Sequence, residues 1–248
     1  MLKELRNLLS FLTILPFRMD SNLLSDCARF MFLFPLIGGL IGLLAGLFGW
    51  VCLYLFLPSL VVGALVLGIL LLITGLHHTD GLLDFGDGVM AHGSPERKIE
   101  VMHDKLTGAG GLTLGMMALL VTALALSELN INIIIQSVIV IEVAAKLSMV
   151  VGAWAGKPVH QGMASSFLEA MQGSKGNTRL LAALAISFGI AIPLLWLNGV
   201  VVIVASIVSS LTMVLISHRH FNGVTGDVLG ATNELARMVS IVMLVALI

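Results

Sequence analysis

Long apolar runs separated by short polar breaks dominate the chain. Six of these runs approach or exceed the roughly 20 residues that a helix needs to cross the hydrocarbon core of a bilayer. They cover residues 32–57, 59–76, 108–127, 131–156, 179–197 and 199–217. A further apolar stretch, from about Leu235 to Ile248, is short for a full crossing. The pattern predicts an all-α, polytopic membrane bundle with about six to seven transmembrane helices.

Residues 1–18 carry an amphipathic pattern instead of an unbroken apolar one. A helix there would place two groups on opposite faces: Leu2, Leu5, Leu8, Leu9 and Leu12 against Lys3, Glu4, Arg6 and Asn7. This division is typical of a helix lying in the membrane interface. The alternative is a signal peptide, but Pro16, Arg18 and Asp20 follow where small residues at a cleavage site would be expected. We therefore predict an N-terminal interfacial helix.

Composition and charge exclude several classes of protein. Of the 248 residues, 58% are hydrophobic and only 11% are charged, with a mean hydropathy of +1.06, whereas a soluble domain carries about 25% charged residues. The net charge of -1 offers no basic field for nucleic acid. Cys27 and Cys52 form neither a CxxC pair nor a disulfide framework. We expect one domain over residues 1–248 with the lipid bilayer as partner. The oligomeric state, a homo-oligomer included, is left open.

The basic residues indicate an orientation in the membrane. Twelve of the thirteen lie before the first span or in and next to the polar segments 77–107, 157–178 and 218–234, and only Lys146 does not. The turns near residues 58, 128 and 198 contain none. Because Lys and Arg are enriched in cytoplasmic loops, we predict a multi-pass protein of the cytoplasmic (cell) membrane. Its three polar segments, treated as loops, would form a site that faces the cytoplasm.

Two acidic clusters carry the strongest chemical signal. Asp80, Asp84 and Asp87 recur at i, i+4 and i+7, so a helix would place three carboxylates on one face. These like charges repel unless a divalent cation such as Mg²⁺ binds their oxygens. Glu100 and Asp104 form another acidic pair four residues apart. The five carboxylates favour a site for one or two metals that hold phosphate oxygens. The alternative is a solvated acidic loop with neighbouring basic residues.

Two further segments are candidates for phosphate binding. Around Gly226, glycines expose backbone N–H groups and Thr225 offers a hydroxyl. The alternative there is a Gly-rich turn in which Asp227 caps the next helix. Ser165 and Ser166, between the fourth and fifth spans, could hold a phosphate or simply form a turn.

The chain resembles cobalamin 5′-phosphate synthases, also called adenosylcobinamide-GDP ribazoletransferases. The resemblance rests on HTDGLLDFGDG at 78–88, PERKIEVMHDKLTGAGG at 95–111, SFLTILPF at 10–17, FPLIGGLIG at 34–42, QGMASSF at 161–167 and GVTGDVLGATNE at 223–234. These segments run nearly from end to end. The resemblance implies an Mg²⁺-dependent integral membrane enzyme that joins α-ribazole, or its 5′-phosphate, to adenosylcobinamide-GDP and releases GMP. This is the last assembly step of cobalamin.

Under this resemblance the polar residues take specific roles. Asp80, Asp84, Asp87 and Glu100 would hold Mg²⁺, and Asp104 would act as general base. His78 would orient phosphates. Substrate binding is expected from a larger set, namely Arg97, Lys105, Ser165, Ser166, Thr225, Asp227, Asn233 and Glu234.

Two other functions stay open as alternatives. CDP-alcohol phosphotransferases have a similar spacing of acidic residues, but Val89 and Met90 replace the Ala-Arg of their motif. A membrane transporter could use Glu142 and Lys146, because ionisable residues inside a span usually mark function or face the bundle interior. The other interpretation of that pair is an intrahelical ion pair, and no internal inverted repeat favours a transporter.

Overall fold

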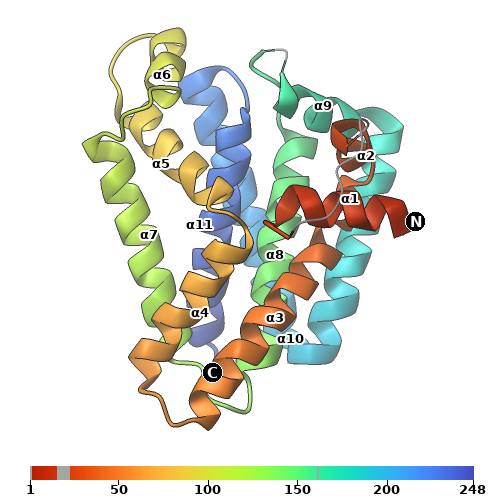
Figure 1. Cartoon of the computed structure of the whole chain (residues 1–248). Coiled ribbons are helices and arrows are strands. Elements are labelled where there is room, and N and C mark those ends of the chain that lie inside the picture. Colours follow the sequence, from red (N-terminus) through yellow and green to blue (C-terminus); the bar gives the residue numbers. More distant parts are fainter. Residues whose placement is uncertain (1, 16–22, 161) are drawn as a thin grey trace.

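The computed structural model describes residues 2–15, 23–160 and 162–248, and within these ranges the protein is helical, with no strand (Figure 1). In chain order the elements are α1 (Leu2–Leu12), α2 (Leu23–Arg29), the 3-10 helix η1 (Met31–Leu33), α3 (Phe34–Tyr54), α4 (Ser59–Ile73), α5 (His77–Met90), α6 (Pro95–Met102), α7 (Ala109–Ser127), α8 (Ile134–Ala155), α9 (Met163–Ala170), α10 (Gly173–Phe221) and α11 (Gly226–Val245). The predicted all-α class is confirmed.

Most of the predicted membrane-spanning helices are present. In the described part of the chain, η1 with α3, α7, α8, α10 and α11 are each long and apolar enough to cross a membrane, while α4 and α5 pass this test only as a pair bent by 96°. With 49 residues, α10 would be about 73 Å long as one helix, more than twice a hydrocarbon core of about 30 Å. Trp196 breaks it with φ 53° and ψ -132°. Its two arms match the predicted spans 179–197 and 199–217, and the multi-pass bundle is confirmed.

The three polar segments predicted to connect the spans are largely helical, and the helical register expected for Asp80, Asp84 and Asp87 is present in α5. Residues 77–107 contain α5 and α6, residues 157–178 contain α9, and residues 218–234 include the first turns of α11. α11 begins at Gly226 rather than near Leu235, and its 20 residues are long enough to span. Low hydropathy was the signal for these loops. It does not distinguish polar residues exposed to water from polar residues buried between helices.

α8 lies at the centre of the bundle. Every residue from Val140 to Ala153 is buried, and α3, α10 and α11 pack around this helix. The buried stretch includes two ionisable residues, Glu142 and Lys146. The interior of the bundle therefore contains charged side chains, and its stability depends on the partners that these charges have.

α1 lies crosswise below α2 and α9, whereas α3, α7 and α8 run along the length of the bundle (Figure 1). Leu8 and Leu12 on its apolar face are buried. Asn7, expected on the polar face, is buried as well, because its amide donates a hydrogen bond to Asp26 on α2 at 3.1 Å. The amphipathic helix is thus present, and part of its polar face contacts protein.

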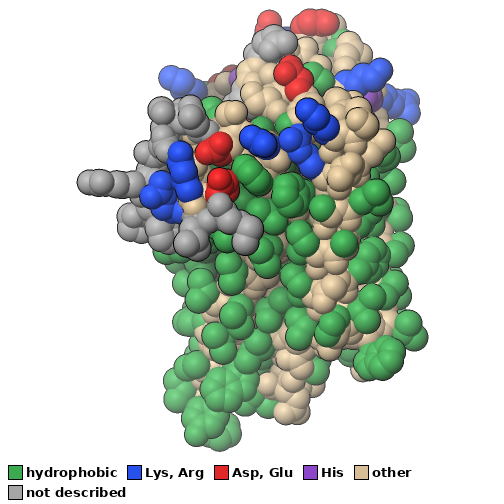
Figure 2. All heavy atoms as spheres, turned by 90° about the vertical axis from the view of Figure 1, so that its right-hand side faces the viewer, with side chains coloured by type: hydrophobic (Ala, Val, Ile, Leu, Met, Phe, Trp, Pro, Cys, Tyr) green, Lys and Arg blue, Asp and Glu red, His purple; other side chains and the backbone are tan. Residues whose placement is uncertain are grey.

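Charged side chains gather at one end of the molecule, above a body that is mostly apolar on the face drawn in Figure 2. α2, α6 and α9 lie at this charged end, and the turns near residues 58 and 128 lie at the other end (Figure 1). Arg237 departs from the sequence-based assignment of basic residues to this end. It is only 1% exposed, inside α11, so it is an interior charge rather than a marker of orientation.

Candidate active site

The helix that carries the first acidic cluster is positioned by a sharp bend. Gly75 and Leu76 both adopt positive φ angles, 65° and 62°, directly after α4. Glycine accepts this conformation readily and leucine does so at a cost. The bend of 96° turns α5 against α7 and α11 at the charged end of the bundle. The carboxylates of α5 are therefore carried by a packed helix and not by a mobile loop.

Two glycines of the HTDGLLDFGDG segment allow α5 to approach its neighbours closely. A Cβ atom on Gly81 would lie 2.9 Å from the carbonyl oxygen of Asp227 on α11. A Cβ atom on Gly86 would lie 2.8 Å from the Cα atom of Gly111 on α7. Both distances are shorter than any side chain tolerates without movement of the backbone. The glycines of this segment therefore set the distance between α5 and the acidic residue of α11.

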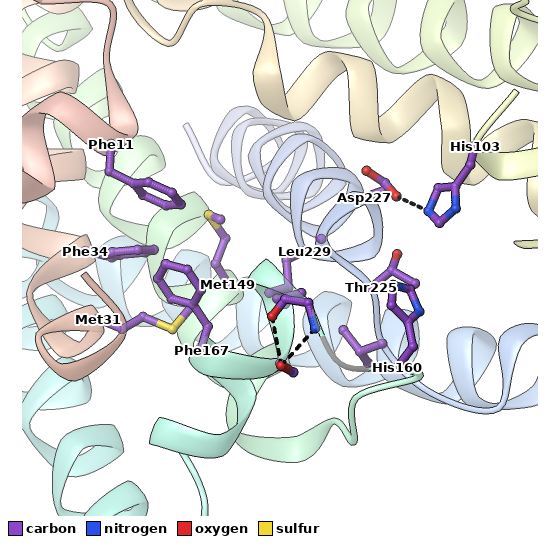
Figure 3. Close-up of a pocket in the computed structure, with 15 residues that line it drawn as sticks. Phe11, Met31, Phe34, His103, Met149, His160, Phe167, Thr225, Asp227 and Leu229 are labelled. Atoms are coloured by element: carbon purple, nitrogen blue, oxygen red, sulfur yellow. Dashed lines mark hydrogen bonds and ion pairs between the residues drawn. The ribbon is translucent and has the colours of Figure 1, made fainter. Parts of the chain in front are cut away.

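A like-charged group gathers where α5 meets α11. Asp84 interacts electrostatically with three other carboxylates of the same charge, those of Asp80, Asp87 and Asp227. It also interacts with His103, whose ring carries the opposite charge when it is protonated. The ring of His103 lies 3.5 Å from the carboxylate of Asp227 (Figure 3). His103 was missed by the sequence reasoning, although it stands inside one of the segments that carry the resemblance. Its position directly before Asp104 could have drawn attention to it.

The remaining predicted metal ligands have other partners in the structure. Asp87 accepts hydrogen bonds from the backbone N–H groups of Gly108 at 2.7 Å and Gly111 at 2.8 Å, at the start of α7. Glu100 pairs with Arg97 at 2.9 Å on the surface of α6. Within residues 2–15, 23–160 and 162–248, no group of three His, Cys, Asp or Glu side chains is already arranged to hold a metal ion.

Asp104 and Lys105 lie in the exposed connection that leads from α6 to α7. Asp104 accepts a hydrogen bond from the backbone N–H of Leu106 at 3.1 Å. These two residues and Glu100 are exposed at the surface, and their predicted roles stay predictions.

A cavity of about 300 Å³ opens beside this group (Figure 3). It lies among α1, η1, the start of α3, α8, α9 and the start of α11. His103, His160, Thr225 and Asp227 line one part of it. The segment around Gly226 that was predicted to bind phosphate therefore forms a wall of this cavity.

The hydroxyl groups predicted to bind phosphate are partly used in capping. Thr225 accepts a hydrogen bond from the N–H of Val228 at 3.3 Å and so caps α11, which corrects the alternative in which Asp227 is the cap. Ser165 lines the cavity and hydrogen-bonds with the backbone of Gly162. Ser166 is exposed and does not line it.

Asn233 and Glu234 belong to a buried network instead of the cavity wall. Arg237 donates to Glu142 at 2.5 and 3.2 Å and also to Glu234, and Lys146 donates to Asn233 at 2.6 Å. The expected intrahelical pair between Lys146 and Glu142 is present at 3.9 Å, but Arg237 is the closer partner of that carboxylate. The substrate contacts predicted for Asn233 and Glu234 stay predictions.

His78 is 7% exposed and does not line the cavity. Its backbone faces Gly230 of α11, and its side chain interacts electrostatically with Lys146 and Arg237. Within the described part of the chain, its Nδ1 atom is buried without a hydrogen-bond partner. His78 is therefore a buried residue at the contact of α5 with α11, and its predicted catalytic role stays a prediction.

These features define a class, namely a multi-pass helical membrane protein with an acidic site and a cavity at the charged end of its bundle. A model of the family described as cobalamin-5-phosphate synthase matches residues 4–245. The chain belongs to this family, as the resemblance seen in the sequence predicted.

Relatives named adenosylcobinamide-GDP ribazoletransferase match over nearly their full length. The protein of Methanococcoides burtonii is 32% identical, over 98% of this chain and 92% of its own. That of Methanosarcina mazei is 30% identical, over 94% and 88%. That of Methanocella arvoryzae is 34% identical, over 97% and 94%. No solved structure matches the chain.

Proposed function

We propose that the protein is an adenosylcobinamide-GDP ribazoletransferase. It joins adenosylcobinamide-GDP to α-ribazole or its 5′-phosphate and releases GMP, and the product is adenosylcobalamin or its 5′-phosphate. Family membership over residues 4–245 and the shared name of the relatives support this activity. The structural observation that carries the proposal is the pair of His103 and Asp227 in the wall of a cavity, with Asp80 and Asp84 of α5 close enough to Asp227 to interact electrostatically.

The reaction is a displacement at phosphorus. A ribose hydroxyl of the nucleoside attacks the cobinamide-linked phosphorus, a new O–P bond forms, and the P–O bond to GMP breaks. The hydroxyl proton must pass to a base. His103 is better placed for this than Asp104, because it lines the cavity and because Asp227, at 3.5 Å, can hold its ring in one orientation.

The residue types at this site suit a divalent cation such as Mg²⁺, and the described side chains would have to move together to hold one. Carboxylate oxygens are the ligands that this ion prefers, and Asp80, Asp84 and Asp227 are like charges whose repulsion a cation would relieve. These three residues would hold the ion. It would supply charge neutralisation for the diphosphate and for the departing GMP. Asp87 would keep its two backbone hydrogen bonds, which hold α5 against the start of α7.

The distribution of basic residues supports a location and an orientation for the protein. We propose that it lies in the cytoplasmic membrane with the charged end, and hence the site, in the cytoplasm.

The alternative functions find no support in the contacts. Glu142 and Lys146 are buried and bonded to Arg237 and Asn233 inside the bundle, which favours a structural role over a transport path. Val89 and Met90 still replace the Ala-Arg of the CDP-alcohol phosphotransferase motif.

The test is release of GMP from adenosylcobinamide-GDP by purified protein with α-ribazole and Mg²⁺. Asp84→Asn should lower the rate by a factor on the order of 100, because it removes an oxygen ligand and a charge at the reacting group. Glu128→Gln is the matched control and should stay within about threefold of the parent, because Glu128 is exposed in the turn between α7 and α8 at the opposite end of the bundle. Release of CMP from a CDP-alcohol, with none of GMP, would contradict the proposal.

A further inference from the structure

Three phenylalanine rings from three separate segments form one end of the cavity. Phe11 comes from α1, Phe34 from the first residue of α3, and Phe167 from α9. The centroids of Phe11 and Phe167 are 5.1 Å apart with planes tilted by 26°, and Phe34 lies 6.2 and 6.1 Å from them. Met31 and Met149 lie beside these rings (Figure 3). This end of the cavity is apolar and aromatic.

The opposite end of the same cavity is polar. His103 and Asp227 form their pair there, next to Thr225 and His160 (Figure 3). A cavity with one aromatic and one hydrogen-bonding end suits a ligand of the same two-part character. Its volume of about 300 Å³ lies at the lower end of the range of roughly 300–1,000 Å³ for small-molecule sites. That is enough for a nucleoside and too small for a corrinoid joined to a nucleotide.

We propose that this cavity is the binding site of the nucleoside co-substrate, with its base against Phe11, Phe34 and Phe167 and its ribose towards His103 and Asp227. The inference rests on the proposed function and assigns one of its two substrates to a place. The benzimidazole base of α-ribazole is planar, two-ringed and uncharged, so it can stack on aromatic side chains. The ribose hydroxyl then meets the acidic group, and the corrinoid diphosphate binds outside the cavity, over α5.

This placement gives α1 a function beyond the membrane interface. Phe11 lies on that helix and stacks against Phe167 on α9, so α1 supplies part of the substrate site. The placement also predicts a preference among bases. The side chains around the aromatic end are three phenylalanines and two methionines. A base with an amino group on its edge, such as adenine, would leave that group without a partner there.

The test separates binding of the nucleoside from the reaction. We would measure equilibrium binding of α-ribazole alone to the full-length protein in detergent, and the KM of each substrate in the GMP-release assay. Phe11→Leu and Phe167→Leu keep an apolar side chain and remove the ring. Each should weaken α-ribazole binding and raise its KM by roughly 3-fold to 10-fold, with the KM of adenosylcobinamide-GDP within about twofold. Phe188→Leu, on α10 and away from the cavity, is the matched control and should change neither.

The possible outcomes distinguish the inference from the proposed function. If the ring-removing variants raise the KM of adenosylcobinamide-GDP and leave α-ribazole binding unchanged, the assignment of the cavity is wrong while the activity stands. If the parent releases no GMP, the proposed function fails, and the binding measurement still decides what the cavity holds. If Phe167→Leu does not fold, Phe11→Leu on a separate helix carries the test. Equal binding of α-ribazole and its adenine counterpart would overturn the predicted base preference.

Discussion

Replacement of Arg237 by glutamine tests whether the buried charges hold the bundle together as one neutral unit. Four ionisable side chains meet there, and all are at most 3% exposed: Glu142, Lys146, Glu234 and Arg237. Two are acidic and two are basic, so the group is neutral as a whole. Arg237 is the central member, because it bonds both carboxylates.

The expected cost follows from the charge that the substitution leaves behind. Arg237→Gln leaves two buried carboxylates with Lys146 alone, and removal of one partner from a buried pair typically costs about 3–5 kcal/mol. For a chain of this size that corresponds to a fall in Tm of roughly 6–20 °C. In the double variant Glu142→Gln/Arg237→Gln, Glu234 and Lys146 are the two charges that remain, so the group is neutral again. Since replacement of a whole buried pair is often close to neutral, it should recover to within about 2 kcal/mol of the parent.

The assay is thermal unfolding of the purified variants in one detergent, followed by tryptophan fluorescence. Arg97→Gln is the control for loss of an arginine at the surface. Its partner Glu100 is exposed, so this change should cost less than about 1 kcal/mol. The reasoning is refuted if Arg237→Gln is no more destabilising than Arg97→Gln. It is equally refuted if the double variant is less stable than the single one.

Three further predictions concern the site and the orientation. Asp227→Asn loses its charge interaction with His103, so GMP release should fall at least about 10-fold with an unchanged Tm. Gly81→Ala should cost about 1–3 kcal/mol of stability and reduce activity, because the new Cβ would lie 2.9 Å from a backbone oxygen of α11. Gly68→Ala is its control: the new Cβ would meet open space, so this change should be neutral or stabilising by up to about 1 kcal/mol. A cysteine placed at exposed Ser94 should resist an impermeant thiol reagent in intact cells and react after lysis.

Each of these predictions has a contradicting result. Normal turnover of Asp227→Asn would reduce that residue to a structural role. Equal stability of Gly81→Ala and Gly68→Ala would mean that α5 does not depend on close approach to α11. Labelling at position 94 from outside intact cells would reverse the orientation and place the site outside the cytoplasm.

Most of the spans could be predicted from the sequence alone. The predicted runs 108–127 and 131–156 agree within three residues with the helices Ala109–Ser127 and Ile134–Ala155. The reason is that partition into a bilayer depends on the local sum of side-chain hydrophobicity, which any short window of sequence contains. The helical spacing of Asp80 and Asp84 was visible for a similar reason, because it depends only on neighbours along one helix.

Only the tertiary structure decided which polar residues share a site. Asp227 interacts with Asp84 although more than 140 positions separate them in the sequence. Glu100 is only 16 positions from Asp84 and pairs with Arg97 on the surface instead. The close approach of α5 to α11 brings the first pair together, and spacing along the chain contains no such information. Phe11 and Phe167 likewise looked like ordinary apolar residues of two separate segments. Their contact across one cavity exists because helices that are far apart in sequence pack side by side, and that packing depends on the shape of the whole bundle.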